Sequence, residues 1–320
     1  MTHYDVFNGD ADGLCALHQL RLAEPKDSRL ITGVKRDISL LDKIEAVAGD
    51  TITVLDVSLD KNRTALDDLL AQDVSILYFD HHYAGEKLPQ HENLAIYIDT
   101  SPETCTSLLV NDYLQGQYLP WAVAAAFGDN LHVSARTAAA ELSYSDSQLE
   151  SLCELGTCLN YNGYGSNLDD LHFNPAELYQ KMQPYADPFD FIEHENAYHV
   201  LRKGYYDDMS TAQNISPEFA EQTVALYVLP DAKWSRRVSG VFGNQLSTAE
   251  PGRAHAILSI LPGGGYQVSV RAPQINKTGA DELCRAFPTG GGRKGAAGIN
   301  LLAESDLALF IQHFRRQYQA

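Results

Sequence analysis

The chain has 320 residues, enough for one large domain or two of ordinary size, and we expect two. Its 42 acidic and 24 basic side chains give a formal net charge of −18. This charge argues against binding to long DNA or RNA and to anionic membranes, because such binding depends on many Lys and Arg contacts with phosphate. A hydrophobic content of 44% excludes wholesale disorder.

Three further features predict a cytoplasmic protein. No run approaches the ~18 apolar residues of a membrane span, and the first residues, MTHYDVFNGD, lack the character of a signal peptide. The five cysteines form neither a metal-type pair nor a dense disulfide framework, so we read them as reduced thiols.

The first hundred residues have the pattern of alternating strands and helices. Helical spacing of leucines, such as Leu14, Leu17 and Leu20, separates most of the apolar or β-branched runs. Such alternation predicts an α/β fold with a mostly parallel sheet that is buried on both faces. The runs that we predict as strands are 4–7, 29–34, 51–57, 75–79 and 94–98.

Acidic and imidazole side chains follow these predicted strands. Ligands of open parallel sheets bind outside the carboxyl ends of the strands. A concentration of carboxylates at that edge is costly unless a cation neutralises it, so the pattern predicts a metal site. The residues concerned are Asp10 and Asp12, Asp56, Asp80 with His81 and His82, and Asp99.

The rest of the chain divides into a helical stretch and a second α/β domain. Residues 120–220 have mainly helical composition, which Gly, Pro and Asn interrupt in NYNGYGSN and MQPYADPFDF. Strand-like and helix-like runs alternate again beyond them. We predict a catalytic domain at 1–210, helical from about 120, and a smaller α/β domain at 222–320.

Two acidic motifs of the first domain each have a structural alternative. In NGDADG at 8–13, Asp10 and Asp12 face one pocket if the turn is extended and the helix starts at Leu14, which suits hard cations. The alternative is a turn that caps a helix. The DHH sequence at 80–82 offers imidazole beside carboxylate, and the alternative there is a surface turn.

The third motif is TGGGRKGAAGIN at 289–300. Gly290, Gly291 and Gly292 allow a ligand to approach the backbone, whose successive amides can form an anion-binding nest. Arg293 and Lys294 add positive charge, which favours phosphate. A flexible glycine hinge is the alternative.

The order of these motifs resembles the DHH phosphoesterase family, in the subclass with a C-terminal DHH-associated domain. That subclass includes RecJ-type nucleases, nanoRNases and dinucleotide phosphodiesterases. The resemblance covers nearly the whole chain. It rests on DxD at Asp10 and Asp12, on Asp56 in VLDVSLD, on Asp80-His81-His82, on Asp129 in AAAFGDN, on TCTSLLV at 104–110, and on VSVRAP followed by GGGRKGAAG.

The resemblance implies two divalent ions, with Mn²⁺ expected and Mg²⁺ or Co²⁺ as alternatives. Asp10 and Asp56 would hold one, and the other would be held by Asp12, Asp56, His81 and Asp129. A hydroxide between the ions would attack phosphorus. The catalytic residues would be His82, Asp80 and Arg293, and the active site would lie in the cleft between the domains. The second domain would bind substrate through Ser269, Arg271, Gly290, Gly291, Gly292, Arg293 and Lys294.

The sequence departs from the family pattern at three positions. Val6 stands where many members have His, and Asn8 stands where nuclease-type members have Asp, so Asn8 would be a weak neutral ligand of the first ion. Arg293 stands where His is usual, and an arginine suits a phosphate clamp better than proton transfer.

Chain length and acidity favour a small nucleotide as substrate over long nucleic acid or membrane. Tyr161 and Tyr164 could stack on bases, with core packing as the alternative. We expect hydrolysis of linear 5′-phosphorylated dinucleotides such as pGpG or pApA. A 3′-phosphoadenosine 5′-phosphate phosphatase, a cyclic dinucleotide phosphodiesterase and a nucleotide-binding regulator are the alternatives. The sequence leaves monomer and homodimer open.

Overall fold

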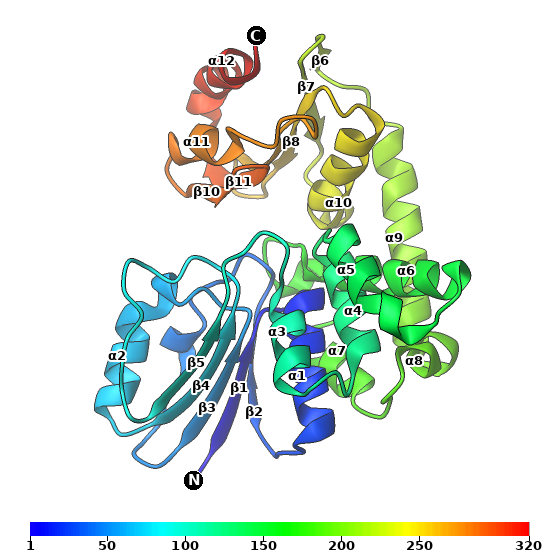
Figure 1. The fold of residues 1–320 in the computed structure, drawn as a ribbon. Helices are drawn as coiled ribbons and strands as arrows, with labels where there is room; N and C mark the ends of the chain where they lie inside the picture. The colour runs from blue at the N-terminus through cyan, green and yellow to red at the C-terminus, as the bar shows by residue number, and fades with distance from the viewer. Residues whose placement is uncertain (320) are drawn as a thin grey trace. The chain divides into compact units, whose positions relative to one another are not determined.

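The computed structural model describes residues 1–319, which form two compact units, Met1–Lys203 and a second that begins at Gly204. The first unit contains a five-stranded, fully parallel sheet with the order β2-β1-β3-β4-β5 (Figure 1). All five strands lie where the hydrophobic runs predict them. They are β1 (His3–Phe7), β2 (Arg29–Ile31), β3 (Thr51–Leu55), β4 (Ser75–Asp80) and β5 (Leu94–Ile98).

Helices cover both faces of this sheet (Figure 1). On one face, Leu66 and Leu69 of α2 (Arg63–Ala71) belong to a buried cluster with strand residues such as Val54. On the other face lie α1 (Ala11–Ala23) and α3 (Thr106–Tyr113). The central strands β1 and β3 are therefore almost wholly buried, whereas the edge strands β2 and β5 have exposed side chains.

The remainder of the first unit is helical, as predicted. A capping box at Ser145 starts α6, which continues through NYNG at 160–163 and ends at Gly163, so the predicted interruption begins at Tyr164. The helices are α4 (Leu119–Gly128), α5 (His132–Ala139), α6 (Asp146–Gly163), α7 (Pro175–Met182), α8 (Pro188–His194) and α9 (Asn196–Gln213). None of the helices in residues 1–319 is long and apolar enough to cross a membrane.

The second unit contains a six-stranded mixed sheet with the order β10-β11-β9-β8-β7-β6. Helices α11 (Ala280–Arg285) and α12 (Leu307–Tyr318) contribute Leu283, Phe310 and Phe314 to its core. The helix α10 (Lys233–Ala249) packs against β8 and β9. The strands are β6 (Phe219–Ala220), β7 (Val224–Leu229), β8 (Ala254–Ile260), β9 (Tyr266–Arg271), β10 (Gly290–Arg293) and β11 (Ala296–Leu302).

A buried ion pair joins β1 to α1 in the first unit. Asp5 is fully buried and accepts hydrogen bonds from Nε and Nη2 of Arg21 at 2.9 and 2.6 Å and from Ser28 Oγ at 2.6 Å. Burial by itself would raise the pKa of Asp5. The hydrogen bonds from Arg21 and His3 outweigh this effect and lower the pKa to about 2. The carboxylate therefore stays charged and fixes α1 on the sheet.

Substitution of Asp5 by asparagine should lower the free energy of unfolding by about 3–5 kcal/mol, because it leaves a buried guanidinium without a counter-charge. Urea denaturation measures the change. Asp67→Asn is the matched control, since it removes only the exposed ion pair between Asp67 and Arg63 and should cost under about 1 kcal/mol.

The sign of the pH dependence follows from the lowered pKa. The carboxylate contributes its full stabilisation above the unfolded pKa near 3.8, and this stabilisation is lost as the pH falls towards 2. The difference in stability between the parent protein and Asp5→Asn should therefore narrow from pH 4 to pH 2. A difference that stays constant over this range would contradict the assigned ion pair.

Candidate metal centre

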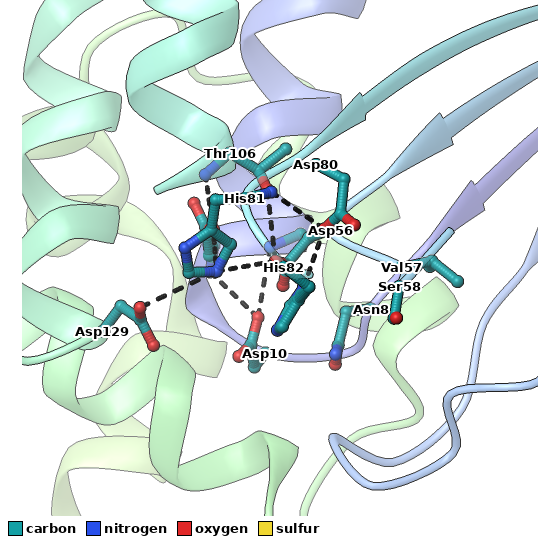
Figure 2. A network of polar contacts seen from close by, with 12 residues as sticks. Asn8, Asp10, Asp56, Val57, Ser58, Asp80, His81, His82, Thr106 and Asp129 are labelled. Atoms are coloured by element: carbon teal, nitrogen blue, oxygen red, sulfur yellow. Dashed lines mark hydrogen bonds and ion pairs between the residues drawn. The ribbon is translucent and has the colours of Figure 1, made fainter. Parts of the chain in front are cut away.

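The carboxyl edge of the parallel sheet gathers acidic and imidazole side chains, as Figure 2 shows. Asp10 follows β1, Asp56 follows β3, and Asp80, His81 and His82 come at the end of β4. Asp129, at the end of α4, joins them from the helical part. Asp99, which follows β5, does not join them, because its exposed carboxylate accepts from the amide of Ser101 in a turn.

The two carboxylate oxygens of Asp10 make different contacts. Its Oδ1 caps α1 by accepting from the amides of Asp12 and Gly13 at 3.0 and 3.1 Å, and its Oδ2 accepts from Nζ of Lys35. The helix therefore begins at Ala11 and not at Leu14 as predicted, because the Asp10 side chain replaces the missing helical acceptor. The capping turn and the acidic site are both present.

Asp12 lies in the first turn of α1 and points at the start of α3. Its two oxygens accept from the amides of Thr106 and Ser107 at 2.8 and 2.7 Å. The positive end of α3 thus holds this carboxylate in one orientation. The segment 104–110, one of the stretches that resemble the DHH family, supplies the N-terminus that does this.

Asp56 occupies a left-handed backbone conformation, with φ of 59°, directly after β3. Its amide bonds to the carbonyl of Phe79 at 3.0 Å, and Thr106 Oγ1 donates to its Oδ1 at 3.2 Å. Burial raises the pKa of Asp56 well above its usual range, and the charges of Asp12 and Asp10 raise it further. Close carboxylates of this kind require a cation to stay ionised together.

His81 faces these carboxylates with its Nε2 nitrogen. Its Nδ1 lies 3.1 Å from the carbonyl of Thr104, which can only accept, so Nδ1 carries the hydrogen. Nε2 then lies 3.4, 3.8 and 4.0 Å from Asp56 Oδ1, Asp12 Oδ2 and Asp129 Oδ2. One imidazole nitrogen is thus placed among three carboxylate oxygens.

Asp56, His81 and His82 offer ligand atoms that lie close enough together to hold a metal ion. The spacing of 3.4–4.0 Å between the nitrogen and the oxygens suits ligands that each lie about 2.0–2.6 Å from a common centre. The backbone carbonyl behind His81 provides the support that metal-binding histidines normally have. Asp12 and Asp129, which lie within 4.0 Å of the same nitrogen, are further candidate ligands.

His82 lies beside this group and is partly exposed. Its Nδ1 bonds to Asp80 Oδ1 at 2.7 Å, and 39% of its side chain is accessible. Asp80 is fully buried and also accepts from the amide of His81 at 2.9 Å. Burial lowers the pKa of His82, but the hydrogen bond and charge of Asp80 outweigh this, so the pKa lies above its usual value. Asp80 thus orients His82.

Lys35 is the residue of the site that the sequence did not reveal. Its Nζ donates to Asp10 and, at 2.9 Å, to Asn160 Oδ1, and it lies 3.7 Å from Asp129 Oδ1. Burial lowers the pKa of Lys35, but the charges of Asp10, Tyr164 and Asp129 raise it more, so the amine is protonated. No local pattern marks Lys35, because its partners are distant in sequence.

The two predicted stacking tyrosines differ in the structure. Tyr161 is fully buried, and its hydroxyl bonds to His172 at 2.8 Å, so the prediction of a base-stacking surface is wrong for this residue. It packs in the interior because α6 continues past it. Tyr164 is half-buried, and its ring centroid lies 5.6 Å from Nζ of Lys35.

The glycine motif of the second unit forms a strand, not the predicted loop. Gly290–Arg293 is β10, which pairs antiparallel with Ala296–Ile299 of β11 at the edge of the sheet. A Cβ at Gly290 would lie 1.8 Å from the carbonyl oxygen of Cys284, and Gly292 has φ of 137°. These glycines are therefore needed for packing, whereas Gly291 borders open space.

The other predicted contacts of the second unit have distinct environments. Ser269 is buried, and its hydroxyl accepts from Arg271 Nη1 at 3.0 Å, so it supports that arginine and does not present an open surface. Arg271 also donates to Asn244 Oδ1 at 2.6 Å and to the carbonyl of Gly240 at 3.0 Å. Arg293, the last residue of β10, and Lys294, in the turn that follows, are both exposed.

Comparison with known proteins gives structural matches alone, because no family model and no curated protein matches this sequence. Exonuclease RecJ bound to manganese has a TM-score of 0.65 at 16% identity, over 98% of this chain and 89% of that one. The chain has the fold of RecJ. This confirms the fold that the resemblance to DHH phosphoesterases implies.

Two further structures share this fold. RecJ from Thermus thermophilus, in complex with Mn²⁺, has a TM-score of 0.66 at 16% identity, over 98% of this chain and 51% of that one. PggH from Vibrio cholerae, a pGpG-specific phosphodiesterase, has a TM-score of 0.54 at 13% identity and matches 98% of this chain and 99% of its own. The match to PggH thus covers nearly the whole of both chains.

Proposed function

We propose that this chain is a manganese-dependent phosphodiesterase that hydrolyses short linear 5′-phosphorylated oligoribonucleotides, with dinucleotides such as pGpG or pApA as the best substrates. The observation that carries the proposal is the His81 nitrogen directed at three carboxylate oxygens within 4.0 Å. The manganese in the RecJ structures supports the choice of ion, and PggH, of matching length, supports the choice of substrate.

The ion would be held by Asp12, Asp56, His81 and Asp129. When bound, it supplies positive charge that stabilises the transition state of phosphoryl transfer. The chain's own contribution is to hold these ligands on strand ends and helix termini, so that little reorganisation is needed on binding. Thr106 supports two of them at once, by donating its amide to Asp12 and its hydroxyl to Asp56.

His82 is the group that would act on the leaving oxygen. Asp80 binds its Nδ1, so Nε2 is the nitrogen available to donate a proton or a hydrogen bond. Against the effect of burial, the hydrogen bond and charge of Asp80 raise its pKa, which favours the protonated imidazole that a general acid requires. The formal net charge of −18 disfavours the binding of long polyanions. It is compatible with short substrates that are bound by nearby cationic groups.

A panel of substrates tests the proposal. Purified protein with Mn²⁺ is incubated with pGpG, pApA, a cyclic dinucleotide, 3′-phosphoadenosine 5′-phosphate and longer RNA, and kcat/KM is compared. We expect the linear dinucleotides to rank first and a chelator to abolish turnover. A higher value for either of the two other small substrates would replace the proposed specificity. Binding without turnover would identify a nucleotide-binding regulator.

We also propose that Arg293 grips the 5′-phosphate of the substrate. Its exposed guanidinium suits bidentate binding of phosphate. Arg293→Ala should then raise KM for 5′-phosphorylated dinucleotides by about tenfold or more, in line with one lost charge-assisted contact. Steady-state kinetics on dinucleotides with and without the 5′-phosphate measures the effect.

Arg285→Ala provides the control for this substitution. Arg285 is exposed in the same unit and pairs with Asp281 on its own helix, so its loss should leave KM unchanged. If Arg293→Ala raises KM equally for phosphorylated and unphosphorylated dinucleotides, Arg293 does not bind the 5′-phosphate.

A further inference from the structure

Lys35 is fixed at the carboxyl edge of the sheet by its backbone. It follows β2, which neighbours β1, so it lies next to the turn that carries Asp10. Its amide donates to the carbonyl of Gly163 at 2.8 Å, and its carbonyl accepts from Asn8 Nδ2 at 3.3 Å. The lysine is thus anchored to two neighbouring elements before its side chain makes any contact.

The oxygens around Nζ form a cation-binding shell. Asp10 Oδ2 and Asn160 Oδ1 accept hydrogen bonds from Nζ, and Asp129 Oδ1 lies 3.7 Å from it. The centroid of the Tyr164 ring lies 5.6 Å from the same nitrogen. Two carboxylates, an amide oxygen and an aromatic ring are all groups that attract positive charge. The position beside Asp10 is therefore filled by an ammonium.

Asp129 connects this position with the metal centre. Its Oδ1 faces Lys35, while its Oδ2 lies 4.0 Å from the Nε2 of His81. The carboxylate therefore spans two adjacent cation positions, as a bridging ligand does. One position has an imidazole lone pair and carboxylate oxygens for a metal, and the other has the ammonium of Lys35.

The ammonium of Lys35 disfavours a second ion beside Asp10. Asp10 Oδ1 also accepts two amide hydrogen bonds at the start of α1, and Val6, fully buried in the sheet, offers no ligand atom. Asn8 Oδ1 is buried without a hydrogen-bond partner among the described residues, but it is uncharged and would be a weak ligand. A divalent ion at Asp10 would also be repelled by the ammonium that shares this carboxylate.

We propose that this chain binds one divalent ion, at Asp12, Asp56, His81 and Asp129, and that the Lys35 ammonium takes the place of a second ion beside Asp10. The inference rests on the proposed metal-dependent function and replaces the two-ion centre that the family resemblance implies. Lys35 then neutralises Asp10 and holds Asp129 towards the single ion.

Manganese binding to the metal-free full-length protein tests this without any assay of activity. Electron paramagnetic resonance of free Mn²⁺ during a titration gives the stoichiometry, and the spectrum of the loaded protein distinguishes an isolated ion from a coupled pair. We expect one ion per chain and the spectrum of an isolated ion. Two ions per chain with a coupled spectrum would refute the inference and leave the proposed function intact. No binding would refute both.

Lys35→Met tests the role of the lysine itself, because it keeps the length of the side chain and removes the charge. We expect the stoichiometry to rise from one to two, with a coupled spectrum. Lys43→Met is the matched control, since Lys43 pairs with Asp37 on the surface and should leave one ion bound. Circular dichroism establishes that each variant is folded. A stoichiometry that stays at one in folded Lys35→Met would refute the assignment of Lys35 to an ion position.

Discussion

Replacement of His81 by alanine is expected to abolish phosphodiesterase activity and tight binding of Mn²⁺. His81 provides the nitrogen that faces Asp12, Asp56 and Asp129. Without this nitrogen the ion loses a ligand, and without the ion the three carboxylates repel one another. Metal ions supply several kcal/mol of transition-state stabilisation, so kcat/KM should fall by about 10³-fold or more. Kinetics and a Mn²⁺ titration measure the two effects together.

His91→Ala is the matched control for this experiment. His91 is exposed in a loop of the same unit and accepts a hydrogen bond from the amide of Asn93. Its loss should change neither Mn²⁺ affinity nor kcat/KM. A His81→Ala protein that still binds Mn²⁺ as tightly as the parent would exclude His81 as a ligand.

Substitution of Asp80 by asparagine should lower kcat by about 10²–10⁴-fold while Mn²⁺ stays bound, because general acid catalysis contributes an effect of this size. Asp80 acts through His82, whose Nδ1 it binds at 2.7 Å, and the carboxylate raises the pKa of that imidazole. Removal of the charge lowers this pKa. His82 then loses its proton at a lower pH. In a plot of kcat against pH, the decrease on the alkaline side should therefore begin at a lower pH than in the parent protein.

The double variant Asp80→Asn with His82→Ala separates a positioning role from a general structural one. If Asp80 works through His82, the two substitutions together should cost little more than His82→Ala alone. Additive losses, or an unshifted pH profile in folded Asp80→Asn, would show that Asp80 does not act through His82.

Much of the first unit could be predicted from local pattern. Apolar runs fixed the position of the five strands, and the parallel topology then placed Asp10, Asp56 and His81 on one edge. Asp99 shows the limit of that argument, because a residue can follow a strand and still turn outward to its own backbone. Strand order predicts the edge of the sheet but not the direction of each side chain.

Other features could not be predicted, because they depend on contacts between distant segments. Lys35 reaches Asp10 and Asn160 from a loop of ordinary composition. Tyr161 is buried because α6 continues through a stretch rich in Asn and Gly. The glycines at 290 and 292 are fixed by close approach to Cys284 and Ala297, which no local pattern contains.

The left-handed backbone at Asp56 limits which side chains this position can tolerate. Aspartate and asparagine enter that conformation more readily than most other residues with a side chain, and glycine enters it freely. Glutamate would keep the charge but lose the backbone preference, whereas glycine would keep the backbone and lose the ligand. Position 56 therefore has two independent requirements, a ligand side chain and a residue that tolerates the left-handed backbone. Asparagine removes the charge but keeps the size of the side chain and the backbone conformation.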